Sequence, residues 1–222
     1  MNGSCVVIKI GGSVIRNRNK LLCLCKKIEN LLEKDYKIVV IPGGGELADK
    51  IREIYNKHKI PDDLAHWMAI LCMDINGIYV SGINKKFVTV ESMRKCKSEL
   101  NRGNVPVFLT FNFLREKDDL PKSWDVTSDS ISLYVSRLLG ANLILLKDVD
   151  GLYKNLKDKK KIIEMLSVKD LLKSKGMMCV DKYFPKLLSK YKMDAWVISG
   201  FHPERLEKLL KTKTTVGTCI KH

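Results

Sequence analysis

The stretch VVIKIGGSV, residues 6–14, contains an apolar run that ends at two adjacent glycines. The run Val6–Ile10 predicts a buried β-strand, and Gly11 and Gly12 predict the turn that follows it. After this turn, the segment 21–32 has apolar residues at helical spacing: Leu21, Leu22, Cys25, Ile28, Leu31 and Leu32. The stretch therefore predicts a strand, a glycine turn and a helix in direct succession.

The same order recurs along the chain. A second apolar run, Ile38–Ile41, ends at Pro42 and three glycines, and residues 46–57 then predict a helix. Further strands are predicted at 105–109, 143–146, 195–198 and 216–220, and further helices at 63–80 and 127–139. Strands that alternate with helices favour an α/β fold, in which a mainly parallel sheet is covered by helices on both faces.

The net charge of +15 raises the question of a nucleic-acid partner. Lysines cluster in residues 154–161 and again from 208 to 221. Neither cluster is interleaved with stacking aromatic residues, and the sequence has no helix-turn-helix, zinc-finger or RNA-binding signature. A solvated surface and anionic small-molecule substrates explain the charge at least as well. We therefore expect no nucleic-acid partner.

Composition also bears on location and on metals. The hydrophobic fraction of 45% and the charged fraction of 29% are typical of soluble globular proteins. No apolar run approaches the roughly 18 residues that span a membrane, and the N-terminus does not resemble a signal peptide. The seven cysteines are an odd number and include no CxxC pair, so we expect buried free thiols, no zinc site and a reducing, cytoplasmic location.

Three turns follow predicted strands, at the edge of the sheet where ligands of α/β folds bind. They are Lys9–Val14, Ile41–Asp49 and Leu145–Tyr153. Glycines let backbone N–H groups approach an anion closely, and Lys9 adds a full positive charge. Taken alone, each of the first two motifs could be an ordinary turn between a strand and a helix. The third, taken alone, could be a hairpin that ends a strand.

A further acidic segment precedes the predicted helix 127–139. Thr127 or Ser128 is expected to be its N-cap, with Asp129 in the first turn. Asp129 either complements the positive end of the helix or serves as an active-site carboxylate. His66 is expected to pack in the core rather than bind a ligand, and Trp124 either contacts substrate or anchors its loop.

Taken in order, five motifs resemble the amino acid kinase superfamily: KIGGS (9–13), PGGGELAD (42–49), WDVTSDSIS (124–132), KDVDGLY (147–153) and VGT (216–218). The resemblance covers essentially the whole chain. It implies a three-layer αβα sandwich that uses ATP and Mg²⁺ to phosphorylate a carboxylate, carbamate or phosphate. A single domain, residues 1–222, is expected, with two lobes as the alternative: an acceptor side of about 1–125 and a nucleotide side of about 126–222.

Within the superfamily, AHWMAILCMD (65–74) and LPKSWDVTSDS (120–130) look most like the methanogen branch that acts in methanofuran biosynthesis. The acceptor of that branch is [5-(aminomethyl)furan-3-yl]methyl phosphate. Isopentenyl phosphate kinases have a histidine after the glycine triplet, where this chain has Glu46–Asp49. Uridylate kinase and isopentenyl phosphate kinase remain alternatives, as does a non-catalytic sensor, against which Lys9 and Asp129 argue. A homo-oligomer is expected.

The resemblance also implies roles for particular residues. The expected catalytic residues are Lys9, Asp129 and Lys182, with Lys186 as the alternative because KGMMCVDKYFPK (175–186) departs from the family's glycine-methionine-x-x-lysine motif. The expected nucleotide-binding residues are Gly11, Gly12, Ser13, Lys147, Asp148, Asp150, Gly151 and Tyr153. The expected acceptor-binding residues are Gly43, Gly44, Gly45 and Asp125, where Asp125 orients either the substrate amine or a water on Mg²⁺.

Overall fold

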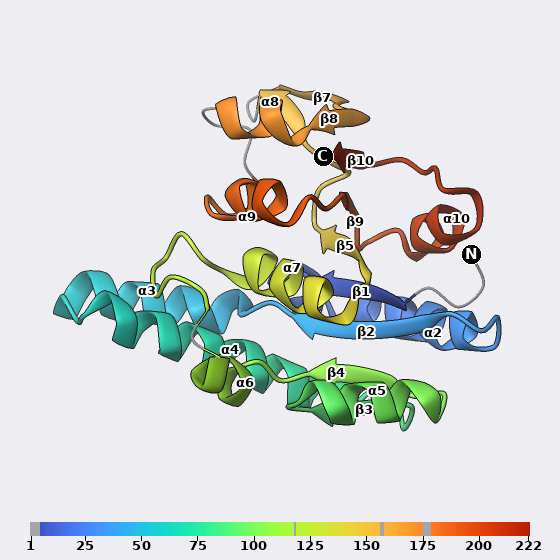
Figure 1. The fold of residues 1–222 in the computed structure, drawn as a ribbon, viewed down its shortest axis with the longest axis horizontal. Helices are drawn as coiled ribbons and strands as arrows, with labels where there is room; N and C mark the ends of the chain where they lie inside the picture. Colours follow the sequence, from blue (N-terminus) through green and yellow to red (C-terminus); the bar gives the residue numbers. More distant parts are fainter. Residues whose placement is uncertain (1–4, 118, 156–157, 175–178) are drawn as a thin grey trace.

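The computed structural model describes residues 5–117, 119–155, 158–174 and 179–222 of the 222-residue chain. Its centre is an eight-stranded sheet (Figure 1). The strands in spatial order are β3 (Phe87–Val90), β4 (Val105–Phe108), β2 (Lys37–Pro42), β1 (Cys5–Ile10), β5 (Asn142–Lys147), β9 (Ala195–Ser199), β10 (Thr218–Lys221) and β8 (Met165–Ser167). All neighbouring pairs are parallel except β9 and β10.

Helices cover both faces of this sheet. The buried residues of α1 (Gly12–Arg16), α2 (Arg18–Leu32) and α10 (Pro203–Thr212) belong to one apolar cluster. Most buried apolar residues of α5 (Met93–Asn101), α6 (Phe111–Lys117), α7 (Ser128–Leu139), α8 (Val168–Lys173) and α9 (Phe184–Tyr191) belong to another. Within β1, Val7 joins the second cluster, whereas Val6 and Ile8 join the first. The predicted α/β fold with a mainly parallel sheet between two helical layers is confirmed.

Every strand predicted from an apolar run is present, with its ends moved by a few residues. The closing strand, expected at 216–220, begins at Thr218. The segments 46–57 and 63–80 form α3 (Gly45–His58) and α4 (Asp62–Ser81), which pack against each other. The edge strand β3 was not predicted. The lysine-rich segment contributes β6 (Tyr153–Asn155) and β7 (Asp158–Ile162), an antiparallel pair outside the main sheet.

Helix α4 corrects one expectation from the sequence. It has 20 residues and a mean hydropathy of 1.2, so by length and composition alone it is the one described helix that could cross a membrane. Such a result is weak evidence for a membrane span, because the buried helices of folded proteins pass the same test. Here α4 packs on α3 and on strands β2, β3 and β4. The apolar length arises because a second, solvent-facing side of α4 also has large apolar residues.

The fold brings the ends of three central strands together. Because β2, β1 and β5 are parallel neighbours, the glycines after β1 and β2 and Lys147 at the end of β5 meet at one edge of the sheet. Helix α7 packs over β1 beside this edge (Figure 1). The carboxyl edge of the sheet therefore holds the glycine turns and the start of α7 in one place.

Candidate active site

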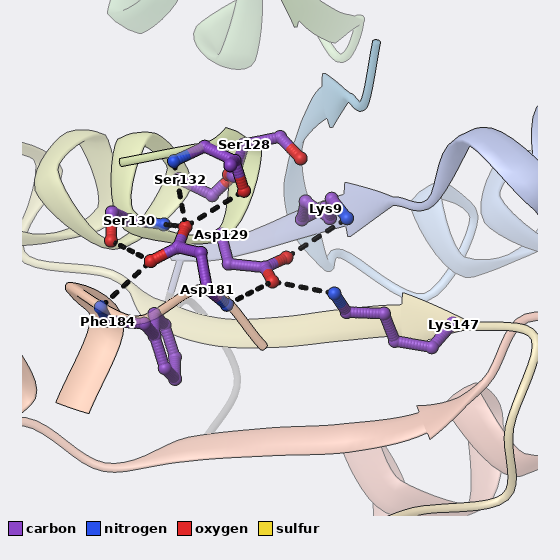
Figure 2. A network of polar contacts seen from close by, with 9 residues as sticks. Lys9, Ser128, Asp129, Ser130, Ser132, Lys147, Asp181 and Phe184 are labelled. Atoms are coloured by element: carbon purple, nitrogen blue, oxygen red, sulfur yellow. Dashed lines mark hydrogen bonds and ion pairs between the residues drawn. The ribbon is translucent and has the colours of Figure 1, made fainter. Parts of the chain in front are cut away.

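Two lysines and one aspartate form a buried cluster at the carboxyl edge of the sheet (Figure 2). Lys9 Nζ lies 3.0 Å from Asp129 Oδ1, and Lys147 Nζ donates to Asp129 Oδ2 at 2.6 Å. The side chains of Lys9, Asp129 and Lys147 are 5%, 3% and 12% exposed. In the register of β1 and β5, Lys9 pairs with Leu145, so Lys147 follows on the same face of the sheet. Strand pairing therefore directs both ammonium groups at α7.

Burial and charge set the protonation of this cluster. Burial lowers the pKa of Lys9 to about 8, because Asp129 offsets only part of the desolvation and Lys147 adds repulsion. Burial also opposes the charge on Lys147, but Asp129 outweighs it and raises the pKa of Lys147. Burial would raise the pKa of Asp129, yet Lys147 and Lys9 hold it at about 2. At neutral pH the cluster contains two cations and one anion.

A second aspartate, Asp181, fixes the start of α7. Its Oδ2 accepts from the backbone N–H groups of Thr127 and Ser130 at 3.0 and 2.9 Å, and from the Thr127 hydroxyl at 2.9 Å. Its Oδ1 accepts from the Ser130 hydroxyl and from the N–H of Phe184, and its own N–H donates to Asp129 at 3.2 Å. Thr127 is the N-cap, as predicted, but Asp181 supplies the capping oxygen. Asp181 thereby joins α7, α9 and Asp129.

The serines of α7 allow its polar start to be buried. All residues from Ser128 to Ser136 are buried, although four of the nine are serines. The hydroxyl of Ser132 donates to the carbonyl of Ser128 at 2.6 Å, and that of Ser136 to Ser132 at 2.7 Å. Because these two hydroxyls bond within the helix, and that of Ser130 bonds to Asp181, the three need no water. Asp129 is therefore presented from a rigid, buried helix.

The two predicted glycine turns touch each other. A Cβ on Gly12 would lie 2.1 Å from Cα of Gly45, a distance that no side chain tolerates. Gly45 also has φ +55°, a conformation that favours glycine. The N–H of Gly43 donates to the carbonyl of Ile10 at 2.8 Å, and Asn76 donates to the Gly43 carbonyl at 2.7 Å. The glycines are needed for this close contact between the starts of α1 and α3.

A cavity of about 270 Å³ opens beside these turns. It is lined by Gly12, Ser13, Gly44, Gly45, Ala48, Asp49, Arg52, His66, Ala69, Ile70, Met73, Trp124, Val126, Thr127, Ser128 and Ile131. One end is therefore the glycine contact and the start of α7. The opposite walls come from α3, α4 and the loop before α7. His66, expected to be only a core residue, is buried and also lines this cavity.

The remaining predicted site residues lie at different places. Asp125 and Lys182 are exposed and form an ion pair with each other at 3.3 Å, outside the lysine–aspartate cluster. Lys186 is exposed on α9. The motif residues 175–178 lie outside the described residues. Among the described lysines, Lys9 and Lys147 are those that form ion pairs with Asp129.

The predicted nucleotide segment forms the loop after β5. Asp150 forms an ion pair with Arg205 of α10, and Asp148 is exposed. Gly151 packs against Thr218: a Cβ there would lie 2.7 Å from the threonine hydroxyl. That hydroxyl accepts from the N–H of Leu152 at 2.8 Å. Tyr153 is buried at 6% exposure. The loop is thus held by α10 and β10.

Two features of the site were not predicted: the contact of Lys147 with Asp129 and the role of Asp181. The first depends on β1 and β5 being neighbours in the sheet. The sequences of these two strands do not show that they pair. For the second, a local signal existed. Proline is common in the first turn of a helix, so Pro185 marks a helix start, and Asp181 lies shortly before it, where a carboxylate can accept from helix N–H groups.

The donor set indicates which ligands the site fits. Among the described residues, no group of three or more His, Cys, Asp or Glu side chains could hold a metal ion. Asp129 is already engaged by two ammonium groups. The described part of the chain therefore supplies no cluster of side chains that would enclose Mg²⁺ without phosphate oxygens. Phosphate oxygens, in contrast, fit two buried ammonium groups and helix-start N–H groups that have no intrahelical acceptor.

A mainly parallel sheet with glycine turns and a buried lysine pair at its carboxyl edge suits an enzyme that transfers a phosphoryl group. The amino acid kinase family model matches residues 4–199 of the sequence. The [5-(aminomethyl)furan-3-yl]methyl phosphate kinase of Methanocaldococcus jannaschii is 36% identical over 96% of both chains. The chain therefore belongs to the amino acid kinase family and is a phosphotransferase.

Solved structures agree on the fold. The uridylate kinase of Archaeoglobus fulgidus superimposes with a TM-score of 0.76 at 22% identity, covering 97% of this chain and 99% of that one. The UMP kinase of Bacillus anthracis gives a TM-score of 0.78 at 18% identity, covering 98% and 96%. At such identities the likeness concerns the fold alone.

Proposed function

We propose that the chain transfers the γ-phosphoryl group of ATP to the phosphate of [5-(aminomethyl)furan-3-yl]methyl phosphate, giving the diphosphate in methanofuran biosynthesis. The observation that carries this proposal is the buried Lys9–Asp129–Lys147 cluster beside a small cavity. The 36% identity to the kinase of that name supports the choice of acceptor.

Phosphoryl transfer requires the protein mainly to position the two substrates and to neutralise the charge on their phosphate oxygens. A phosphate acceptor is already a nucleophile at neutral pH, so no general base is needed. Lys9 and Lys147 would neutralise oxygens of the transferring group, and Asp129 would keep their ammonium groups in place. Mg²⁺, when bound on the phosphates of ATP, would neutralise further charge there.

The neighbourhood of the cluster suggests where each substrate binds. The N–H of Gly43 is already bonded to the Ile10 carbonyl, so the N–H groups of Gly45 and of the rest of the first turn of α3, which have no intrahelical acceptor, would hold the acceptor phosphate. The loop from Lys147 to Tyr153 would lie beneath ATP, with Gly11, Gly12 and Ser13 near its phosphates. The cavity draws 12 of its 16 lining residues from positions 12–124, which supports an acceptor side of about 1–125. The other four, Val126, Thr127, Ser128 and Ile131, lie in α7 or just before it.

An acceptor panel tests the assignment. ATP consumption should be measured with the aminated furan phosphate, UMP, isopentenyl phosphate and acetylglutamate. We expect kcat/KM for the furan phosphate to exceed that for UMP by well over about tenfold, a difference of about 1.4 kcal/mol. Equal or better use of UMP would favour a uridylate kinase. Ligand binding without turnover of any acceptor would favour a non-catalytic sensor.

We also propose that the chain works as a homo-oligomer through α4. The large apolar side chains Leu71, Ile75 and Ile78 are 43%, 54% and 60% exposed, and they follow one another at helical spacing. Light scattering after gel filtration should give more than the 25.3 kDa of one chain. The double variant Ile75→Glu, Ile78→Glu should dissociate, and a wild-type monomer would contradict the proposal.

We place the enzyme in the cytoplasm. The seven cysteines are free thiols within the described ranges, and four of them are buried. Cys23 is exposed, which differs from the expectation that the thiols are buried. Exposed and buried free thiols persist in a reducing compartment. Mass spectrometry of alkylated protein from cells should find them reduced.

A further inference from the structure

His66 is a buried histidine on α4 whose hydrogen bonding fixes its tautomer. Its Nδ1 lies 3.2 Å from the backbone carbonyl of Ser123, and the residue is 5% exposed. A carbonyl only accepts, so Nδ1 has the proton and Nε2 has a lone pair. Burial lowers the pKa of His66, although the Ser123 carbonyl opposes this and Lys122 reinforces it. The neutral ring therefore offers one hydrogen-bond acceptor.

His66 itself stands beside the middle of the cavity. Helices α3 and α4 run antiparallel: a Cβ on Gly44 would lie 3.5 Å from the Ala69 carbonyl, and Tyr55 donates to Asp62 at 2.6 Å. His66 lies between these two contacts on α4. Asp49 and Arg52 lie between them on α3. All three line the same cavity.

The charges on the cavity wall are few. Among the described residues that line the cavity, Asp49 has the only carboxylate, and it forms no ion pair with a described residue. The guanidinium of Arg52 lies 4.9 Å over the ring of Trp124, so its charge is directed onto an aromatic face. A carboxylate without an ion-pair partner and the lone pair of a neutral imidazole both attract a positively charged N–H donor, such as an ammonium group.

We infer that Asp49 and His66 Nε2 form the subsite for the ammonium group of the acceptor, an inference that rests on the proposed function. Asp49 follows Gly45 by four residues, about 6 Å along the helix axis. A phosphate held at Gly45 and an ammonium held by Asp49 are therefore separated by a spacer the size of a small ring. Asp125 is absent from the described cavity lining and is paired with Lys182, so it lies away from this subsite.

Paired substrates test the subsite. The kcat/KM values should be measured for the aminated furan phosphate and for an analogue in which methyl replaces aminomethyl. We expect His66→Phe to lower kcat/KM for the aminated substrate by about tenfold, mainly through KM, because a hydrogen bond to a charged group is lost. The methyl analogue should be used equally well by both enzymes. His66→Gln, which keeps an acceptor oxygen, should retain part of the preference.

Matched variants separate recognition from damage to the fold. Asp49→Asn should lower the ratio of kcat/KM for the aminated substrate to kcat/KM for the methyl analogue. Glu53→Gln, a change at an exposed residue one turn further along α3, should leave this ratio unchanged. If His66→Phe weakens both substrates equally, or leaves the wild-type preference intact, this inference alone is overturned. If the wild-type enzyme uses neither furan phosphate, the proposed acceptor fails and the subsite fails with it.

Discussion

Lys9 and Lys147 stand on adjacent parallel strands, and their ammonium groups contact the two oxygens of one carboxylate, that of Asp129. Two buried cations on one anion leave one positive charge in excess. Such an excess is costly in a dry site and is relieved when an anionic ligand enters. Under the proposed function, the cluster would be arranged for phosphoryl oxygens before any ligand binds, as electrostatic stabilisation of a transition state requires.

The first prediction concerns the two lysines. Lys9→Met and Lys147→Met should each lower kcat by at least about 10²-fold, because each removes a charge that acts on the transferring group. Steady-state kinetics with saturating ATP would measure this. Circular dichroism should report an intact fold, because a neutral side chain of similar length replaces each buried ammonium.

Lys182→Met tests which lysine acts with Lys9: Lys182, expected from the sequence, or Lys147, which contacts Asp129 in the structure. Lys182 is 72% exposed and pairs with Asp125, so we expect a smaller loss of kcat than for Lys147→Met. A loss of kcat in Lys182→Met alone, with near-normal turnover in Lys147→Met, would reverse the assignment. It would also require Lys182 to move toward the site when ATP binds.

The second prediction is a pH profile. Because the pKa of Lys9 is about 8 and its ammonium form is the active one, kcat/KM should fall as pH rises through about 8. The carboxylate of Asp129, with a pKa of about 2, stays ionised throughout. A flat profile between pH 7 and 10 would contradict the proposed role of Lys9.

The same shift predicts a change in stability. At pH values between the folded-state pKa of about 8 and the ordinary pKa of 10.5, Lys9 is protonated in the unfolded chain but has lost its proton in the folded one. The free energy of unfolding should therefore rise with pH in this window. Urea titrations at several pH values would measure the slope. In Lys9→Met the contribution of this residue should vanish, since methionine does not titrate.

The third prediction concerns Asp181. Its carboxylate accepts hydrogen bonds from Thr127, Ser130 and Phe184, which begin two helices. Asp181→Ala should lower the free energy of unfolding by about 2–4 kcal/mol, because the capped N–H groups lose their partner. Asp125→Ala, at an exposed ion pair, should change it by less than about 1 kcal/mol. Denaturant unfolding of both variants makes the comparison.

Local patterns were enough to predict much of this fold. The turn at Gly11 and Gly12 follows an apolar strand, and the N-cap at Thr127 precedes an apolar helix; both signals lie within a few residues. The meeting of Lys9 and Lys147 at Asp129 depends instead on strand order, which arises from packing between segments separated by 137 intervening positions. The capping role of Asp181 likewise depends on α9 docking beside α7.

The edge of the sheet was harder to predict for a similar reason. Strand β3 has only four residues, two of them half-buried, so its apolar pattern is short. Helix α4 shows the opposite problem, because apolar residues on its exposed side lengthen the hydrophobic stretch beyond what burial explains. Both cases reflect neighbours in space that the local sequence does not identify.

The last prediction tests the contact between the two glycine turns. In Gly12→Ala the new methyl would lie 2.1 Å from Cα of Gly45, so the turns must move apart. Because backbone N–H groups of both turns would hold phosphates, even a shift of about 1 Å should lower kcat by about 10²-fold. Gly103→Ala is the matched control. Gly103 has φ +73°, and a Cβ added there would have no atom within 4 Å, so the substitution adds backbone strain without a clash.

The two variants should therefore separate cleanly. Gly103→Ala should lower the free energy of unfolding by about 1 kcal/mol and leave kcat near the wild-type value. Gly12→Ala should lose kcat even when conditions keep it fully folded. Normal kcat in folded Gly12→Ala would mean that the close approach of α1 and α3 serves packing alone. The phosphates would then have to be held by Lys9 and Lys147 without help from the glycine turns.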